Sequence, residues 1–120
     1  PRSINPDASL KPAGDWNLSK TLIRLGASIG ANATILCGIS VGAWAMIGAG
    51  AVVTHNIPNY GLAWGNPARL RGFVCPCGGN LIGKSRDAHV MFAECQECSE
   101  KIEISLMNWE LLEDTDHQST

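Results

Sequence analysis

The sequence contains no long hydrophobic run. None of its stretches approaches the ~20 consecutive apolar residues that a membrane-spanning helix requires, and no secretory signal is visible. The sequence therefore predicts a soluble cytoplasmic protein without membrane partners. Its 120 residues suit one compact domain with a small appendage.

The sequence also lacks a recognisable set of catalytic side chains. Its three histidines are His55, His89 and His117, and none belongs to a recognisable Ser/His/Asp or Cys/His arrangement. No residue is therefore assigned a catalytic role from the sequence, and the catalytic residues stay unknown at this point.

The sequence does contain an internal repeat with a period of six, over residues 23–58. Branched apolar residues return at every sixth position, and a second apolar set recurs four residues after the first. This period fits neither an α-helix nor a simple strand. It predicts an all-β fold, a parallel β-helix in which three hexapeptides form one triangular coil and both apolar sets point inward. The first set is Ile23, Ile29, Ile35, Val41, Ile47 and Val53, and the second is Ala27, Ala33, Ile39, Ala45, Ala51 and Ile57.

The repeat is short for such a fold. It amounts to two coils, residues 23–40 and 41–58, whereas repeat folds generally need three or more units to bury a continuous core. The chain starts with Pro1 rather than Met, so either further coils lie upstream or oligomerisation covers the open coils. Residues 1–22 hold three prolines and no periodic pattern, which predicts an irregular loop or arm.

A few residues interrupt the apolar pattern of the repeat. Cys37 stands apart from the other cysteines and is expected to be a small buried hydrophobe. Trp44 is at an outward position, which predicts a subunit contact, a ligand platform or a single exposed aromatic. Glycines near the corners, such as Gly30 and Gly48, are expected to adopt backbone conformations that a bulky side chain would penalise.

Charge is divided unevenly along the chain. Residues 1–74 hold six basic and two acidic residues, a net charge of +4, and residues 75–120 hold three basic and nine acidic residues, a net charge of −6. The basic repeat region favours an anionic ligand. The acidic second part argues against a nucleic-acid partner.

Four of the five cysteines form two short-spaced pairs after the repeat, Cys75 with Cys77 and Cys95 with Cys98. Two such pairs predict a Zn²⁺ ribbon over residues 73–106, because each pair forms a tight turn and two turns complete a tetrahedral shell. Four thiolates leave no open position, so this zinc would be structural. Two disulfides, which are rare in cytosolic proteins, or a redox pair are the alternatives.

Apolar residues alternate with mostly polar ones in this second part and predict small antiparallel strands. They are Val90, Phe92, Ile102, Ile104 and Leu106. Residues 107–120 are expected to form a tail with a short helical turn around Trp109.

The end of the repeat carries motifs of a known family. They are GAGAVVT at residues 48–54, Pro58, and the segment Gly-Asn-Pro-Ala-Arg at residues 65–69, preceded by GASIGANATIL at residues 26–36. This pattern resembles the closing part of hexapeptide-repeat acyltransferases of the left-handed β-helix class. It is most similar to the branch that N-acetylates nucleotide-linked amino sugars, such as UDP-linked amino-sugar N-acetyltransferases of surface-polysaccharide synthesis. The likeness covers residues 1–72, with the coils and closing segment at residues 23–72.

The resemblance implies a co-substrate and an assembly. In such families acetyl-CoA lies in the groove between two prisms of a homotrimer, and its pantetheine bonds to the coil backbone. By position, cofactor contacts are implied for Ala31, Ala49, Thr54, His55 and Arg69. Small side chains allow a thin ligand to approach the backbone, and a guanidinium pairs well with phosphate. A solvated arginine is the alternative for Arg69.

Two departures from the family pattern affect this interpretation. Family members commonly place Lys or Arg where His55 stands, and a histidine is only partly charged near neutral pH, so weaker phosphate binding is expected. Acceptor-binding residues of the family lie largely in coils upstream of the loop that here opens with Pro1 and Arg2, and those coils are absent from the sequence.

Two functions follow as hypotheses. The first is an acetyl-CoA-dependent N-acetyltransferase acting on a nucleotide-linked amino sugar, represented here by its C-terminal part. The second is a non-catalytic or remnant trimeric β-helix scaffold that lacks the acceptor-binding half. The γ-type carbonic anhydrases share the prism, but they bind metal through three histidines and only His55 lies within these coils, so that activity is not expected.

Overall fold

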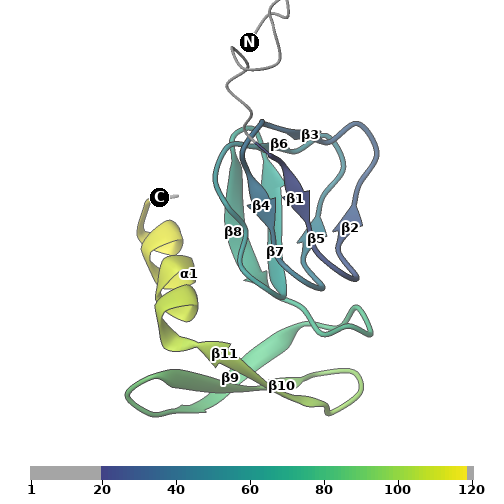
Figure 1. Cartoon of the computed structure of the whole chain (residues 1–120). Helices are drawn as coiled ribbons and strands as arrows, with labels where there is room; N and C mark the ends of the chain where they lie inside the picture. Colours follow the sequence, from purple (N-terminus) through teal and green to yellow (C-terminus); the bar gives the residue numbers. More distant parts are fainter. Residues whose placement is uncertain (1–19, 119–120) are drawn as a thin grey trace, which may run out of the picture.

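The computed structural model describes residues 20–118, with side chains as far as Leu112. A coil of short strands forms one part of the molecule, a three-stranded sheet lies beneath it, and a helix stands beside it (Figure 1). The predicted arm lies, up to residue 19, outside the described residues. Among the described residues, no helix is long and apolar enough to cross a membrane.

Six two-residue strands build the coil. Each strand pairs in parallel with its counterpart one coil later, as in Leu22 with Ser40 and Thr34 with Val52. Three hexapeptides therefore make one coil, and the predicted parallel β-helix is confirmed. The strands are β1 Leu22–Ile23, β2 Ser28–Ile29, β3 Thr34–Ile35, β4 Ser40–Val41, β5 Met46–Ile47 and β6 Val52–Val53.

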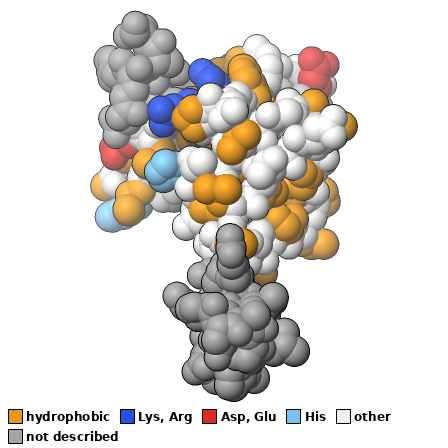
Figure 2. Space-filling view, turned by 90° about the horizontal axis from the view of Figure 1, so that it is seen from above, with side chains coloured by type: hydrophobic (Ala, Val, Ile, Leu, Met, Phe, Trp, Pro, Cys, Tyr) orange, Lys and Arg blue, Asp and Glu red, His pale blue; other side chains and the backbone are white. Residues whose placement is uncertain are grey.

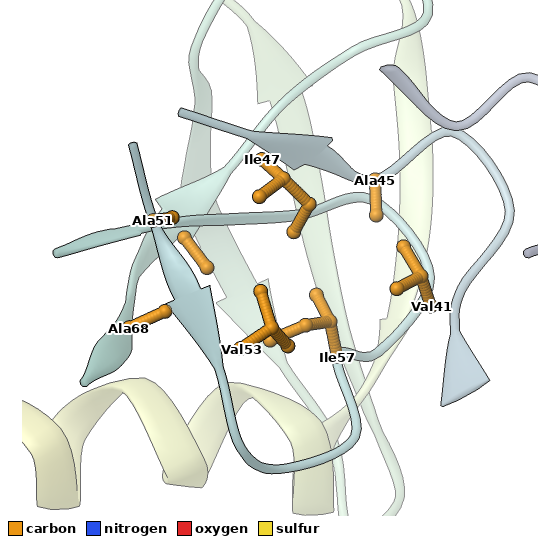
Figure 3. Packing of buried hydrophobic residues seen from close by; sticks show 8 residues of the cluster. Val41, Ala45, Ile47, Ala51, Val53, Ile57 and Ala68 are labelled. Carbon is orange, nitrogen blue, oxygen red and sulfur yellow. The ribbon is translucent and has the colours of Figure 1, made fainter. Parts of the chain in front are cut away.

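The interior of the second coil is closed, whereas that of the first is open. Val41, Ile47 and Val53 are at most 2% exposed and point toward one another (Figure 3). Ile23 and Ile29, at equivalent positions of the first coil, are 44% and 41% exposed. The repeat positions that were predicted to point inward do so. Among the described residues, however, the first coil has no neighbouring coil on its outer side.

The corners of the coil require left-handed backbone at a period of six. The φ angle is positive at Gly26, Asn32, Gly38, Trp44 and Gly50, in the region that few residues other than glycine adopt readily. Gly30 and Gly48 were expected to adopt unusual backbone conformations, but their φ angles are not positive, so that expectation was wrong. They are needed for space, since an added Cβ would meet the next coil or the strand that follows it.

A hairpin closes the coil. Strand β7 (Gly61–Gly65) pairs in parallel with β5, and β8 (Ala68–Phe73) returns antiparallel to β7. Before it, the Oδ1 atoms of Asn56 and Asn59 accept hydrogen bonds of 2.8 Å each from the backbone N–H groups of Ser40 and Ala43. These amide oxygens serve as acceptors where another coil would offer its backbone.

The second part of the chain is an antiparallel sheet followed by a helix. The strands are β9 Leu81–Arg86, β10 Val90–Cys95 and β11 Lys101–Ser105, in the order β11-β10-β9. The predicted strands are therefore present, except that Leu106 begins the helix; β10 buries Met91 and Ala93 and leaves Phe92 39% exposed. Helix α1 (Leu106–Gln118) is longer than the predicted turn, because Trp109 and Leu112 pack against the buried cluster of this sheet.

Candidate functional site

Ala31 and Ala49 occupy the same corner in successive coils, the one that precedes β3 and β6. Both are exposed, and the carbonyl oxygen of Ala31 accepts a 2.9 Å hydrogen bond from the N–H of Gly50. A Cβ on Gly30 would lie 2.5 Å from the backbone nitrogen of Ala49, so the two coils are in close contact here. The corner therefore presents small side chains on closely stacked backbone.

Thr54 and His55 lie at the next corner, directly after β6. Thr54 Oγ1 and His55 Nδ1 form a 3.0 Å hydrogen bond, and His55 is exposed. This corner and the alanine corner border the same face of the coil, which carries β3 and β6. Seen from above, hydrophobic and uncharged side chains cover most of the described part of this side, and charged ones lie at its margins (Figure 2).

A pocket of about 250 Å³ joins His55 to Arg69 of β8. Its remaining wall is mostly apolar, with Ile57, Leu70 and Leu111 among its residues. We call it the His55–Arg69 pocket. The structure thus brings together two of the five residues implied as cofactor contacts, while Ala31 and Ala49 lie at a different corner outside this pocket.

The four predicted metal ligands converge on one point. The Sγ atoms of Cys75, Cys77, Cys95 and Cys98 all lie within 4.8 Å of one another. The Sγ distances are 3.6 Å from Cys75 to Cys98 and 3.6 Å from Cys77 to Cys95. These exceed the ~2.05 Å of a disulfide and approach the ~3.8 Å between thiolates on a tetrahedral zinc with Zn–S bonds of about 2.3 Å.

Backbone N–H groups around this cysteine cluster are arranged to stabilise negative sulfur. Gly79 N–H donates to Cys77 Sγ at 3.4 Å, and Glu97 N–H donates to Cys95 Sγ at 3.3 Å. The backbone N–H groups of Cys98 and Glu97 together lower the pKa of the Cys95 thiol to about 7, against the effect of burial. These contacts fit the donor set to a soft divalent cation that takes four thiolates.

The Cys75 thiol shows the opposite shift. The backbone N–H of Cys77 acts to lower its pKa, but burial and the surrounding thiols outweigh this and raise the pKa to about 12. A buried thiolate among other sulfurs lacks a compensating positive charge. A bound metal ion would supply that charge.

The sequence did not reveal two features near these sites. Leu111 lines the His55–Arg69 pocket, although it belongs to a segment predicted to be a tail. The Arg71 guanidinium lies 5.4 Å from the ring centroid of Trp64, which rests on Gly48. The role of Leu111 depends on the contact between the helix and the coil. The contact of Arg71 with Trp64 depends on the bulge in the β7–β8 hairpin.

The structure tests the predictions made for Cys37 and Trp44 of the repeat. Cys37 is exposed, so the expectation that it is buried was wrong, because it lies at a corner after β3 rather than at an inward position. Trp44 is 38% exposed and its ring covers Gly26, which confirms that it points outward.

The chain is similar to curated acetyltransferases. It is 52% identical over 65 residues to dTDP-3-amino-3,6-dideoxy-α-D-galactopyranose 3-N-acetyltransferase of Aneurinibacillus thermoaerophilus, covering 54% of this chain and 34% of that protein. It is 52% identical over 71 residues to serine acetyltransferase of Salmonella typhimurium, covering 59% and 25%. A solved serine acetyltransferase in complex with CoA matches at 45% identity with a TM-score of 0.42, covering 44% of this chain and 23% of that one.

The homologues of this chain are therefore acetyltransferases of the hexapeptide-repeat family. The chain spans about a third of the length of the amino-sugar acetyltransferase and a quarter of that of the serine acetyltransferase. No protein-family model matches it.

Proposed function

We propose that the chain is the donor-binding, C-terminal part of a cytoplasmic acetyl-CoA-dependent N-acetyltransferase that acts on a nucleotide-linked amino sugar. The observation that carries this proposal is the His55–Arg69 pocket at the closing end of a hexapeptide coil. Its support from known proteins is the 52% identity to an acetyltransferase of a dTDP-linked amino sugar.

The donor's two ends meet different parts of the coil in this proposal. Arg69 provides a planar guanidinium for a phosphate group of CoA, and the His55 imidazole adds a second hydrogen-bonding group. Ala31 and Ala49 leave the backbone open to the thin pantetheine arm, and Thr54 orients His55 through their hydrogen bond. Because Ala31 and Ala49 lie at another corner, the donor follows the β3–β6 face or completes its site on a neighbouring left-handed prism of a homotrimer.

The acetyl group passes from the thioester to a neutral amine of the acceptor. The amine nitrogen forms the new amide bond while the carbon–sulfur bond breaks, and the departing CoA thiolate or solvent takes the proton. This step needs the amine held against the thioester carbonyl. We assign no residue of this chain as a catalytic base.

Calorimetry with acetyl-CoA and a thiol-release assay test this proposal. The acceptor panel is dTDP- and UDP-linked amino sugars together with L-serine, because relatives of both kinds exist. Turnover with an amino-sugar nucleotide supports the proposal, whereas turnover with serine alone would replace it by serine O-acetylation. Absence of acetyl-CoA binding would remove the donor-site assignment.

A second candidate function is a non-catalytic trimeric scaffold. Exposed apolar side chains of the first coil favour an assembly, since Leu22 and Leu25 are 48% and 79% exposed, and no residue of this chain is assigned as a catalytic base. Acetyl-CoA binding without turnover on any acceptor would support the scaffold.

We further propose that Cys75, Cys77, Cys95 and Cys98 bind one structural Zn²⁺. All four sulfurs are engaged in such a shell, which leaves no position for a substrate. The metal's role is to hold β9, β10 and β11 together, because the small sheet has a limited core of its own.

A further inference from the structure

The His55–Arg69 pocket has a wall that does not belong to the repeat. His55 and Arg69 come from the coil and its closing hairpin, but Leu111 comes from α1. Leu111 is 48% exposed and lies one helical turn after Met107, which does not line this pocket. Helix α1 therefore contributes an apolar surface to the pocket that His55 and Arg69 also line.

Helix α1 packs on the core that also contains part of the cysteine cluster. The ring of Trp109 stacks on Phe73 with centroids 5.2 Å apart, and the N–H of Leu106 donates a 2.9 Å hydrogen bond to the carbonyl oxygen of His89. Trp109 packs against the same buried cluster that contains Cys75 and Cys95.

The pocket and the cysteine cluster share this core directly. Leu70 belongs to the buried cluster that contains Cys75 and Cys95, and it also lines the His55–Arg69 pocket. Any change that loosens the cysteine cluster therefore acts on two pocket walls, Leu70 and the helix that carries Leu111.

We propose that Leu111 is a ligand-contacting residue of the His55–Arg69 pocket, and that metal bound at the cysteine cluster sets the pocket's affinity by holding α1 in place. The ligand class is a phosphorylated nucleoside, because apolar walls suit a base or ribose and the adjoining Arg69 guanidinium suits its phosphate. This inference rests on the proposed function, in which that ligand is CoA.

Charges of opposite sign introduced at Leu111 test the contact, and because Leu111 is 48% exposed they leave no cavity in the core. Leu111→Glu places a carboxylate near the bound phosphate and is expected to weaken CoA binding about tenfold, whereas Leu111→Lys tightens it about threefold. Met107→Glu and Met107→Lys, one turn away, are the matched controls and leave affinity within about twofold. The same Leu111 variants should affect dephospho-CoA less if the 3′-phosphate occupies the pocket.

A metal experiment tests the coupling. CoA affinity is measured by calorimetry on the zinc-loaded protein and after removal of zinc, with metal content determined on each sample. Zinc removal is expected to weaken CoA binding at least threefold in the wild type and less in Leu111→Ala, because that variant has already lost the contact that α1 provides. Equal losses in both proteins would overturn the coupling.

The possible failures are distinguishable. If Arg69→Ala weakens CoA binding but both Leu111 charge variants behave like their Met107 counterparts, the inference is wrong and the donor pocket stands. If Arg69→Ala binds CoA as well as Arg24→Ala, an exposed arginine of the first coil, the proposed donor site fails as well. Opposite shifts in the two Leu111 variants support the inference even if zinc-free protein unfolds.

Discussion

The ring of Phe73 and the indole of Trp109 are stacked, with centroids 5.2 Å apart and an interplanar angle of 11°. Phe73 ends the hairpin that closes the coil, and Trp109 lies in the first turns of α1. This aromatic pair is therefore a direct link between the repeat and the helix that follows the cysteine-bearing sheet.

Removal of this stack should destabilise the protein. Trp109→Ala is expected to lower the free energy of unfolding by about 2–3 kcal/mol, less than the ~3–5 kcal/mol of a fully buried tryptophan because Trp109 is partly exposed. Urea unfolding of the zinc-loaded protein measures the change. Met107→Ala, at a residue that is 78% exposed, is the control and should stay within about 0.5 kcal/mol of the wild type.

The cysteine cluster should hold one zinc per chain. Metal analysis of protein purified without chelator is expected to find a 1:1 ratio, and Cys95→Ser should lose the metal because three thiolates and a hydroxyl bind zinc poorly. Cys37→Ser serves as the control, since Cys37 is exposed and outside the cluster. A metal-free wild type, or a disulfide between cluster cysteines, would contradict the assignment.

Gly30 should be intolerant of even one added carbon. Its Cβ would lie 2.5 Å from Ala49 N and 2.8 Å from Ala49 Cα, so Gly30→Ala forces the coils apart and should cost about 2 kcal/mol or more. Gly72→Ala is a matched control because no heavy atom lies within 4 Å of its Cβ position. Thermal unfolding compares the two, and equal stability would show that the coils adjust freely.

Asp87 should add a pH-dependent term to stability. The backbone N–H groups of His89 and Val90 donate to its Oδ1 at 2.7 and 2.8 Å and hold its pKa below the usual aspartate value. Because the folded-state pKa is depressed, this stabilisation is present above the unfolded value of about 3.9 and is lost as pH falls through the folded value.

Asp87→Asn isolates that term, since the amide retains an acceptor but does not ionise. The stability difference between wild type and Asp87→Asn should be constant above about pH 5 and shrink on acidification below the aspartate range. Chemical unfolding across pH 2–7 measures it. A difference that grows on acidification would contradict the role given to the carboxylate.

The protein should be a trimer in solution. Large apolar side chains stay exposed on the coil, including Leu25 at 79%, Leu22 at 48% and Leu36 at 45%, and such a surface usually marks a protein interface. Sedimentation equilibrium should give three times the chain mass of 12.8 kDa. Leu25→Ser is expected to weaken the assembly, while a stable wild-type monomer would refute it.

Much of the fold followed from the hexapeptide period. The inward positions of the second coil were predictable because residues such as Val41 and Ile47 repeat without a break. The paired cysteines likewise indicated their own convergence, since each pair lies in one tight turn. The left-handed φ angle at Trp44 was not predictable, because bulky aromatic residues rarely adopt that conformation, whereas asparagine, as at Asn32, adopts it more often than most residues do.

The sequence alone determined the coil, its register and which four cysteines come together, because these depend on local spacing. Only the tertiary structure decided that His55 and Arg69 share a pocket while Ala31 and Ala49 lie at another corner. It also decided that Leu111, in a segment predicted to be a tail, completes that pocket. Such contacts join residues far apart in the chain, and burial against the coil, which no local pattern encodes, brings α1 to the pocket.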